Sequence, residues 1–184
     1  MVEYQRNLAV QGGSTMNPCT NLKEIVLSEV KKNAIHSNEI MVVCIGNPLR
    51  GDDALGPLVA ELLQKEGFKD NVINAENALE SFIDEISSRK PKVIIFVDAV
   101  DARLHPGDLV FAEVEKTLKH MVSYSTHAIP LPLLLKVMGN PKGYILGAQA
   151  KTLEIGRKPS REIKESARRI VDIIKSVLTV LDKP

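Results

Sequence analysis

An unbroken apolar run at residues 40–45, Ile-Met-Val-Val-Cys-Ile, limits what this chain can fold into more than any other feature. The run is too short for a buried helix and is rich in β-branched residues, so it predicts a strand that is covered on both faces. Gly46 ends the run, and apolar residues then repeat at helical spacing from Leu55 to Leu63. A buried strand followed by an amphipathic helix is typical of an α/β fold.

The same alternation continues along the chain. Further strands are predicted at 71–74, 93–97, 109–114 and 144–148, and further helices at 79–88 and 130–138. Ser160 is a typical N-cap for a last helix, whose apolar stripe runs from Ile163 to Leu181. The turn at 104–108 favours an added strand at an antiparallel edge. We therefore predict a single-domain, three-layer αβα sandwich around a mostly parallel, mixed sheet of about five strands.

The chain divides into three parts. Residues 1–20 contain Gly-Gly-Ser-Thr and lack apolar periodicity, so we expect a flexible N-terminal tail that carries no chemistry. Residues 21–38 are expected to hold a leader helix, N-capped by Asn21, and a linker. Residues 39–184 form the α/β domain, because a chain of 184 residues suits one core.

Charge and composition exclude several classes of protein. Lys and Arg number 24 against 23 Asp and Glu, and no basic patch is interleaved with aromatics, which argues against nucleic acid as a partner. The apolar runs are far shorter than the roughly 20 residues of a membrane span, and the N-terminus lacks a signal peptide's apolar region. We expect a cytoplasmic protein. Its two cysteines support neither a disulfide framework nor a CxxC metal site, and Cys44 is expected to be a core residue.

Three loops carry polar residues that are suited to chemistry. Loop 46–53 ends in two adjacent carboxylates, Asp52 and Asp53, although either one can be explained as a cap of the following helix. Asp98 ends the most apolar strand, where a turn-forming aspartate is the alternative. His127 is the best placed of the four histidines, although a lone histidine is usually structural.

Asp53, Asp98 and His127 are expected to meet, because right-handed crossovers bring the loops of parallel strands to one sheet edge. Two carboxylates and one imidazole suit zinc, nickel, iron or manganese, and they leave coordination positions open for water or a partner's groups. In the first loop we expect Gly46, Asn47 and Gly51 to shape the backbone, and Arg50 and Asp52 to orient a ligand or pair with substrate acids. Phosphate-binding glycine motifs and a Gly-x-Ser-x-Gly elbow are absent from the sequence.

The segments IGNPLRGDDALGP, VDAVDARLHPGDL and STHAIPLPLLL resemble, in order and separation, three signature segments of nickel–iron hydrogenase maturation endopeptidases. LGAQAKTLEIGRKPS resembles the fourth, so the likeness covers residues 40–182. Position by position, it implies that Asp53 and Asp98 are the metal-binding acids and that His127 is the histidine ligand. It also implies the fold shared by phosphorylase-like and peptidyl-tRNA hydrolase-like proteins.

The resemblance implies an aspartic-type, nickel-dependent endopeptidase that removes the C-terminal extension of a hydrogenase large-subunit precursor after nickel insertion. Asp53, Asp98 and His127 would be both the catalytic residues and the ligands of a nickel ion supplied by the substrate, and zinc or cadmium can replace that ion in crystals. We expect a monomer whose partner is the precursor. The chain departs from the family at 74–77, where Asn-Ala-Glu-Asn replaces an Asp-Gly-Gly turn and Glu80 matches a later family acid.

Two alternatives compete with this hypothesis. A nickel-sensing or chaperone module would keep the three ligands without cutting its partner. A peptidyl-tRNA hydrolase also begins with a strand that ends in Gly-Asn-Pro, but it needs a basic RNA face and a His-Asn soon after the first helix, and this sequence has neither.

Overall fold

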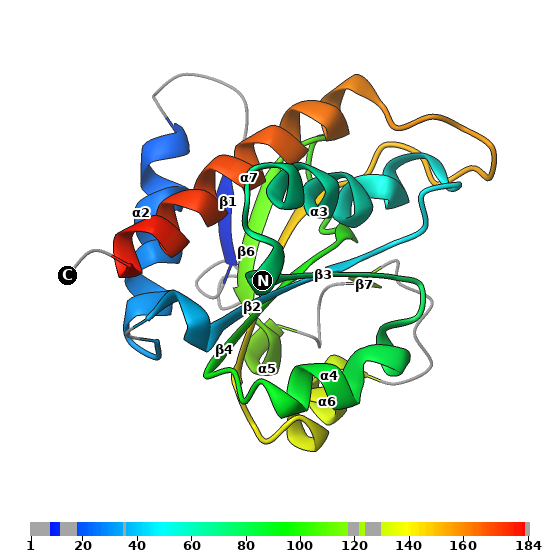
Figure 1. Cartoon of the computed structure of the whole chain (residues 1–184). Coiled ribbons are helices and arrows are strands. Elements are labelled where there is room, and N and C mark those ends of the chain that lie inside the picture. Colours follow the sequence, from blue (N-terminus) through cyan, green and yellow to red (C-terminus); the bar gives the residue numbers. More distant parts are fainter. Residues whose placement is uncertain (1–7, 12–17, 35, 118–121, 124–129, 183–184) are drawn as a thin grey trace.

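The computed structural model describes residues 8–11, 18–34, 36–117, 122–123 and 130–182. Within them, helices cover both faces of an eight-stranded sheet (Figure 1). With η for short 3-10 helices, the elements are β1 Leu8–Gln11, α2 Pro18–Lys31, η1 Ser37–Glu39, β2 Ile40–Ile45, η2 Gly51–Ala54, α3 Leu55–Lys65, η3 Lys69–Asn71, β3 Val72–Glu76, η4 Leu79–Phe82, α4 Ile83–Ser88, β4 Val93–Val97, β5 Ala99–Asp101, β6 Leu109–Glu113, α5 Val114–Thr117, β7 Val122–Ser123, α6 Leu131–Val137, β8 Lys142–Gln149 and α7 Arg161–Leu181. The predicted three-layer α/β architecture is confirmed.

The sheet is mixed and its centre is parallel. The strand order is β1-β6-β8-β4-β2-β3, and β5 and β7 lie off this path. Strand β2 pairs in parallel with β3 and β4, and β4 pairs in parallel with β8, whereas β6 runs antiparallel to β8. The five predicted strands are β2, β3, β4, β6 and β8. Strands β1, β5 and β7 are additional, and their two to four residues are too short for a periodic pattern.

Strand β2 is buried on both faces, as its unbroken apolar run predicts. Ile40, Val42 and Cys44 belong to the core that the sheet shares with α2, α3 and α7, whereas Met41 and Val43 face the core shared with α4 and α6. Each of these five side chains is at most 2% exposed. Figure 1 shows α3 and α7 on one side of the sheet and α4 and α6 on the other. The prediction that Cys44 is a core residue is confirmed.

The N-terminal segment differs from expectation. Residues 8–11 lie in the part expected to be a flexible tail, but they form β1 by pairing antiparallel with β6. Strand β6 is antiparallel as predicted, yet β1 lies outside it, so β6 is not the sheet edge. Helix α2 begins at Pro18, and Asn21 therefore lies inside the helix rather than at its N-cap. Proline suits a first helical turn because its φ is already helical and it has no N–H to satisfy.

The last helix forms as predicted. The Oγ atom of Ser160 accepts a hydrogen bond from the N–H of Ile163 at 3.2 Å and caps α7. The apolar stripe of α7 is buried against the sheet, together with α2 and α3. Among the described residues, no helix combines the length and the apolar character needed to cross a membrane.

Helix α3 approaches β2 more closely than any side chain would allow. A Cβ atom on Gly56 would lie 2.0 Å from the backbone oxygen of Ile45 and 2.6 Å from its nitrogen. The first turn of α3 therefore rests directly on the last residue of β2. This contact fixes the position of the loop 46–53 that connects the two elements.

Replacing Gly56 tests this contact. In an open helix, Gly→Ala stabilises by up to about 1 kcal/mol. Here the added methyl group meets backbone atoms, so we expect Gly56→Ala to lower the free energy of unfolding by about 2–4 kcal/mol. Urea denaturation measures the change, and Glu61→Ala, at an exposed position of α3, is the control. A Gly56→Ala protein as stable as the wild type would show that α3 does not pack this closely.

Candidate functional site

The candidate site lies at the ends of β2 and β4, two neighbouring parallel strands from which the chain continues toward opposite edges of the sheet. Strand β3 lies beside β2 on one side, and β8 lies beside β4 on the other. The chain leaves β2 through α3 toward β3, and it leaves β4 through β5, which pairs with β8. Ligands of open α/β sheets bind at such a switch point, outside the carboxyl ends of the strands. The loops that begin there carry Asp53 and Asp98.

Asp53 is held against the end of β2. Asp53 is only 3% exposed, and its Oδ2 atom accepts a hydrogen bond from the N–H of Asn47 at 3.1 Å. Gly46 adopts a φ of +131°, and a Cβ atom there would lie 2.0 Å from the backbone oxygen of Asp53. Only glycine permits this approach, so Gly46 lets the loop fold back against Asp53.

Asp98 directly follows the adjacent strand β4, at the same edge of the sheet as the end of β2. It is 3% exposed and directly follows Val97, which pairs in parallel register with Cys44 of β2. One residue further along both strands, Asp98 is level with Ile45, next to Gly46. On its other side, Gly147 of β8 comes so close that a Cβ atom there would lie 2.5 Å from the backbone oxygen of Asp98. The structure thus brings both predicted acids to one sheet edge.

His127 lies outside the described residues, so its place beside the two acids stays a prediction. The preceding strand β7 pairs antiparallel with β5, which begins one residue after Asp98. Within the part of the chain that the structure describes, no three His, Cys, Asp or Glu side chains form a group that could hold a metal ion. The two acids form a partial donor set of oxygen atoms.

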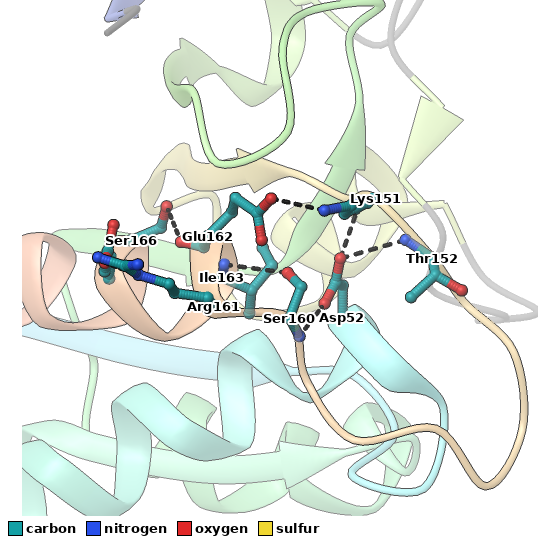
Figure 2. Close-up of polar contacts among 9 residues, drawn as sticks. Asp52, Lys151, Thr152, Ser160, Arg161, Glu162, Ile163 and Ser166 are labelled. Atoms are coloured by element: carbon teal, nitrogen blue, oxygen red, sulfur yellow. Dashed lines mark hydrogen bonds and ion pairs between the residues drawn. The ribbon is translucent and has the colours of Figure 1, made fainter.

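Asp52 connects the loop of Asp53 to a segment that lies far away in the sequence. Its carboxylate is fully buried and accepts three backbone N–H groups, from Lys151 at 2.7 Å, Thr152 at 3.1 Å and Ser160 at 2.7 Å (Figure 2). These partners lie 99 to 108 positions away in the sequence. Neither acid caps α3, because the N-cap of that helix is Ala54 and no side chain caps it. Asp52 therefore joins two loops and holds the backbone next to Asp53, and the expectation that it orients a ligand stays a prediction.

Backbone hydrogen bonds extend the junction between loops 46–53 and 150–160. The N–H of Asp52 donates to the oxygen of Thr152 at 2.9 Å, and the N–H of Gly51 donates to the oxygen of Arg157 at 3.1 Å. Gly51 adopts a φ of +56°, and a Cβ atom there would lie 2.8 Å from the oxygen of Thr152. Only a residue without a side chain fits this position of Gly51. Loop 150–160 is thereby held in a fixed position next to the loop that carries Asp53.

Sequence reasoning missed Gln149, which fixes the loop after Asp98. The residue is 6% exposed, and its Oε1 atom accepts hydrogen bonds from the N–H groups of Ala102 at 2.9 Å and Leu104 at 3.1 Å. Its position at the end of the apolar strand β8 was the available signal, since a buried amide needs partners.

The loop after β3 is strained. Glu76 adopts a φ of +48°, and its backbone oxygen accepts the N–H of Gly46 at 3.0 Å. A left-handed conformation costs a residue with a Cβ atom about 1–2 kcal/mol. This is the segment in which the sequence departs from an Asp-Gly-Gly turn, and Glu80 lies half-buried in the following η4. At Glu76 the chain thus adopts the left-handed backbone conformation that glycine favours, although the residue is not a glycine.

The chemistry open to this edge is that of carboxylates. Burial raises the pKa of the Cys44 thiol well above its usual range, so this cysteine stays protonated and is not a nucleophile. Asp53 and Asp98 supply oxygen atoms that suit a divalent ion, and either carboxylate suits a general base that activates water.

Comparisons with known proteins agree on one family. Residues 57–177 match the family model described as hydrogenase maturation protease. The hydrogenase 3 maturation protease of Escherichia coli K12 is 29% identical over 134 residues, which are 71% of this chain and 85% of that protein. The crystal structure of a [NiFe] hydrogenase maturation protease from Thermococcus kodakarensis superposes with a TM-score of 0.69 at 32% identity, covering 84% of this chain and 99% of that one.

A solution structure of an endopeptidase from Escherichia coli gives a TM-score of 0.63 at 26% identity. It covers 76% of this chain and 88% of that one.

Asp52→Asn tests the junction between the two loops. The amide keeps one acceptor oxygen but turns an NH₂ group toward backbone donors, so we expect the free energy of unfolding to fall by about 3 kcal/mol. Urea denaturation measures the loss. The control is Glu162→Gln, which removes an exposed ion pair with Lys151 beside the same junction and should leave the unfolding midpoint unchanged. Equal stability of the two variants would argue against the junction.

Proposed function

Because this chain belongs to the hydrogenase maturation protease family, we propose that it removes the C-terminal extension of a nickel–iron hydrogenase large-subunit precursor once nickel has been inserted. The observation that carries this proposal is that two buried acids, Asp53 and Asp98, lie at the same edge of the sheet, at its switch point. In this proposal the enzyme recognises a folded substrate by the ion that the substrate brings.

The two acids suit this task by their chemistry and by their fixed positions. Carboxylate oxygens are ligands for divalent ions, and His127 would add an imidazole nitrogen. Asp53 is held by the N–H of Asn47 and by the close approach to Gly46, so its carboxylate is positioned before the substrate arrives. Binding the substrate's nickel at these residues would place the adjacent peptide bond at the sheet edge.

Hydrolysis then requires that water adds to the carbonyl carbon of that peptide bond. A carboxylate of the site, Asp53 or Asp98, would accept the proton of the attacking water and later return it to the leaving amine. The substrate's nickel would polarise the carbonyl when it lies within reach. Both routes use the same pair of acids, and neither needs a covalent intermediate on this chain.

Arg50 is a second substrate contact in this proposal. It is half-buried in the loop that leads to Asp53, and its Nε atom is buried without a hydrogen-bond partner among the residues that the structure describes. A buried donor of this kind favours an acceptor supplied from outside the chain. A carbonyl or carboxylate of the substrate's tail fits this position.

Cleavage of a nickel-loaded precursor tests the function directly. We expect the purified protein to shorten the nickel-loaded precursor but not the nickel-free one, with the products resolved by mass spectrometry. Asp53→Asn, Asp98→Asn and His127→Ala should each lower the rate by a factor on the order of 100 or more, since each removes a ligand or a proton acceptor. Asp70→Asn is the matched control, because it changes an exposed acid of η3 that lies away from this edge.

The outcomes separate this proposal from its alternative. Nickel-dependent binding of the precursor without any shortening would indicate a sensing or chaperone module. Shortening that persists in Asp53→Asn and Asp98→Asn would place the catalytic site elsewhere.

A further inference from the structure

Two large apolar side chains are exposed beside the candidate site. Leu49 is 69% exposed and Ile155 is 82% exposed. They belong to the two loops that Asp52 joins, 46–53 and 150–160. Single exposed apolar residues are common, but two of them on joined loops next to a proposed catalytic acid form a feature that needs explanation.

Leu49 is presented by a tight turn. The N–H of Arg50 donates to the backbone oxygen of Asn47 at 3.1 Å, and the N–H of Leu49 donates to the Oδ1 atom of Asn47 at 2.9 Å. Pro48, between them, restricts the backbone further. The exposed side chain is thus carried on a backbone with little freedom.

Ile155 is presented by a second tight turn. The N–H of Arg157 donates to the oxygen of Glu154 at 3.3 Å, and Gly156 adopts a φ of +79°, as the third residue of a type II turn requires. The N–H of Gly156 then donates to the oxygen of Leu49 at 2.8 Å. This bond joins the two turns, so Leu49 and Ile155 sit on one rigid rim.

A rigid apolar rim favours binding of a partner. Turn tips normally carry Gly, Asn, Asp, Ser or Pro, and exposing Leu and Ile there gives nothing to the stability of the free protein. Apolar groups that are already fixed lose little entropy when they become buried in a complex. A few well-buried side chains account for most of the binding energy in a typical protein interface.

The charge around the rim indicates the chemistry of the partner. Segment 151–158 carries Lys151, Arg157 and Lys158 against Glu154, and Arg50 lies on the neighbouring turn. Lys151 forms an ion pair with Glu162 and Arg157 forms one with Glu154, so the excess positive charge beside the two turns comes from Lys158 and Arg50. Arg157 and Lys158 are both exposed. An apolar pocket bordered by acidic side chains would complement this rim.

We infer that Leu49 and Ile155 form a docking anchor for the folded hydrogenase large-subunit precursor, inserting into an apolar, acid-bordered surface of that protein. This inference rests on the proposed function and adds the surface by which the substrate is held. The rim is continuous with the site, because Asn47 bonds both to Leu49 and to the carboxylate of Asp53. A precursor docked on the rim therefore lies next to the loop that carries Asp53.

The test compares two double variants in the cleavage assay. Leu49→Ser with Ile155→Ser should raise the KM for nickel-loaded precursor by about 10-fold or more, because two anchors are lost, while kcat at saturation stays within about 2-fold. Leu133→Ser with Val137→Ser is the matched control, since it removes two exposed apolar side chains of α6 and should leave KM unchanged. The dissociation constant of the precursor, measured by surface plasmon resonance, should follow KM.

A charge variant tests the choice of partner surface. Lys158→Glu should slow association with the precursor about 3-fold or more at low salt and should lose this effect at high salt, because exposed charges are screened. An association rate that does not change at low salt would contradict an acid-bordered surface on the precursor.

The outcomes distinguish the docking anchor from the function on which it rests. If the wild type neither binds nor cleaves the precursor, both proposals fail. If the wild type cleaves and the Leu49/Ile155 variant keeps its KM and dissociation constant, the anchor is wrong and the function stands. A fall in kcat at unchanged KM would also overturn the anchor, because the turns would then act by positioning Asp53. Thermal unfolding verifies that every variant is folded.

Discussion

The buried carboxylate of Asp52 joins the two loops on which the whole candidate site depends. Burying a charge is costly unless hydrogen bonds replace its hydration, and here three backbone N–H groups do so. One of them belongs to Ser160, the N-cap of α7, where the helix dipole also favours a negative charge. The interaction fixes the position of loop 150–160 relative to Asp53, the next residue in the chain.

Glycine supplies the second constraint, because it lets backbones approach where any side chain would collide. Gly56 lets α3 rest on the end of β2, and Gly46 lets Asp53 turn back against the same strand. The sheet edge is therefore built from contacts between backbones rather than from packed side chains. Such contacts tolerate little displacement, which suits a site that must present two carboxylates in fixed positions.

The sequence predicts those features that rest on local patterns. The apolar run 40–45 and the helical stripes that follow it predict the α/β fold, and the topology of parallel strands predicts that Asp53 and Asp98 meet. Strand β1 was not predictable, because a short added strand is held by backbone bonds to β6 and has no side-chain pattern of its own. The partners of Asp52 were not predictable, because they lie about one hundred residues away in the sequence and leave no local pattern.

The proposed site and the proposed docking anchor depend on each other. In the proposed site, two acids and one histidine would leave coordination positions open, which the substrate would fill with its own ligands to the nickel ion, so the three residues need not hold the ion tightly by themselves. The substrate's own affinity for the enzyme then has to come from contacts away from the ion. The rim of Leu49 and Ile155 can supply such contacts, and the hydrogen bonds between loops 46–53 and 150–160 fix its position relative to Asp53. In this proposal the loop 46–53 serves both recognition, through Leu49, and chemistry, through Asp53, so the residues at the turn tips can vary with the partner while the acids stay in place.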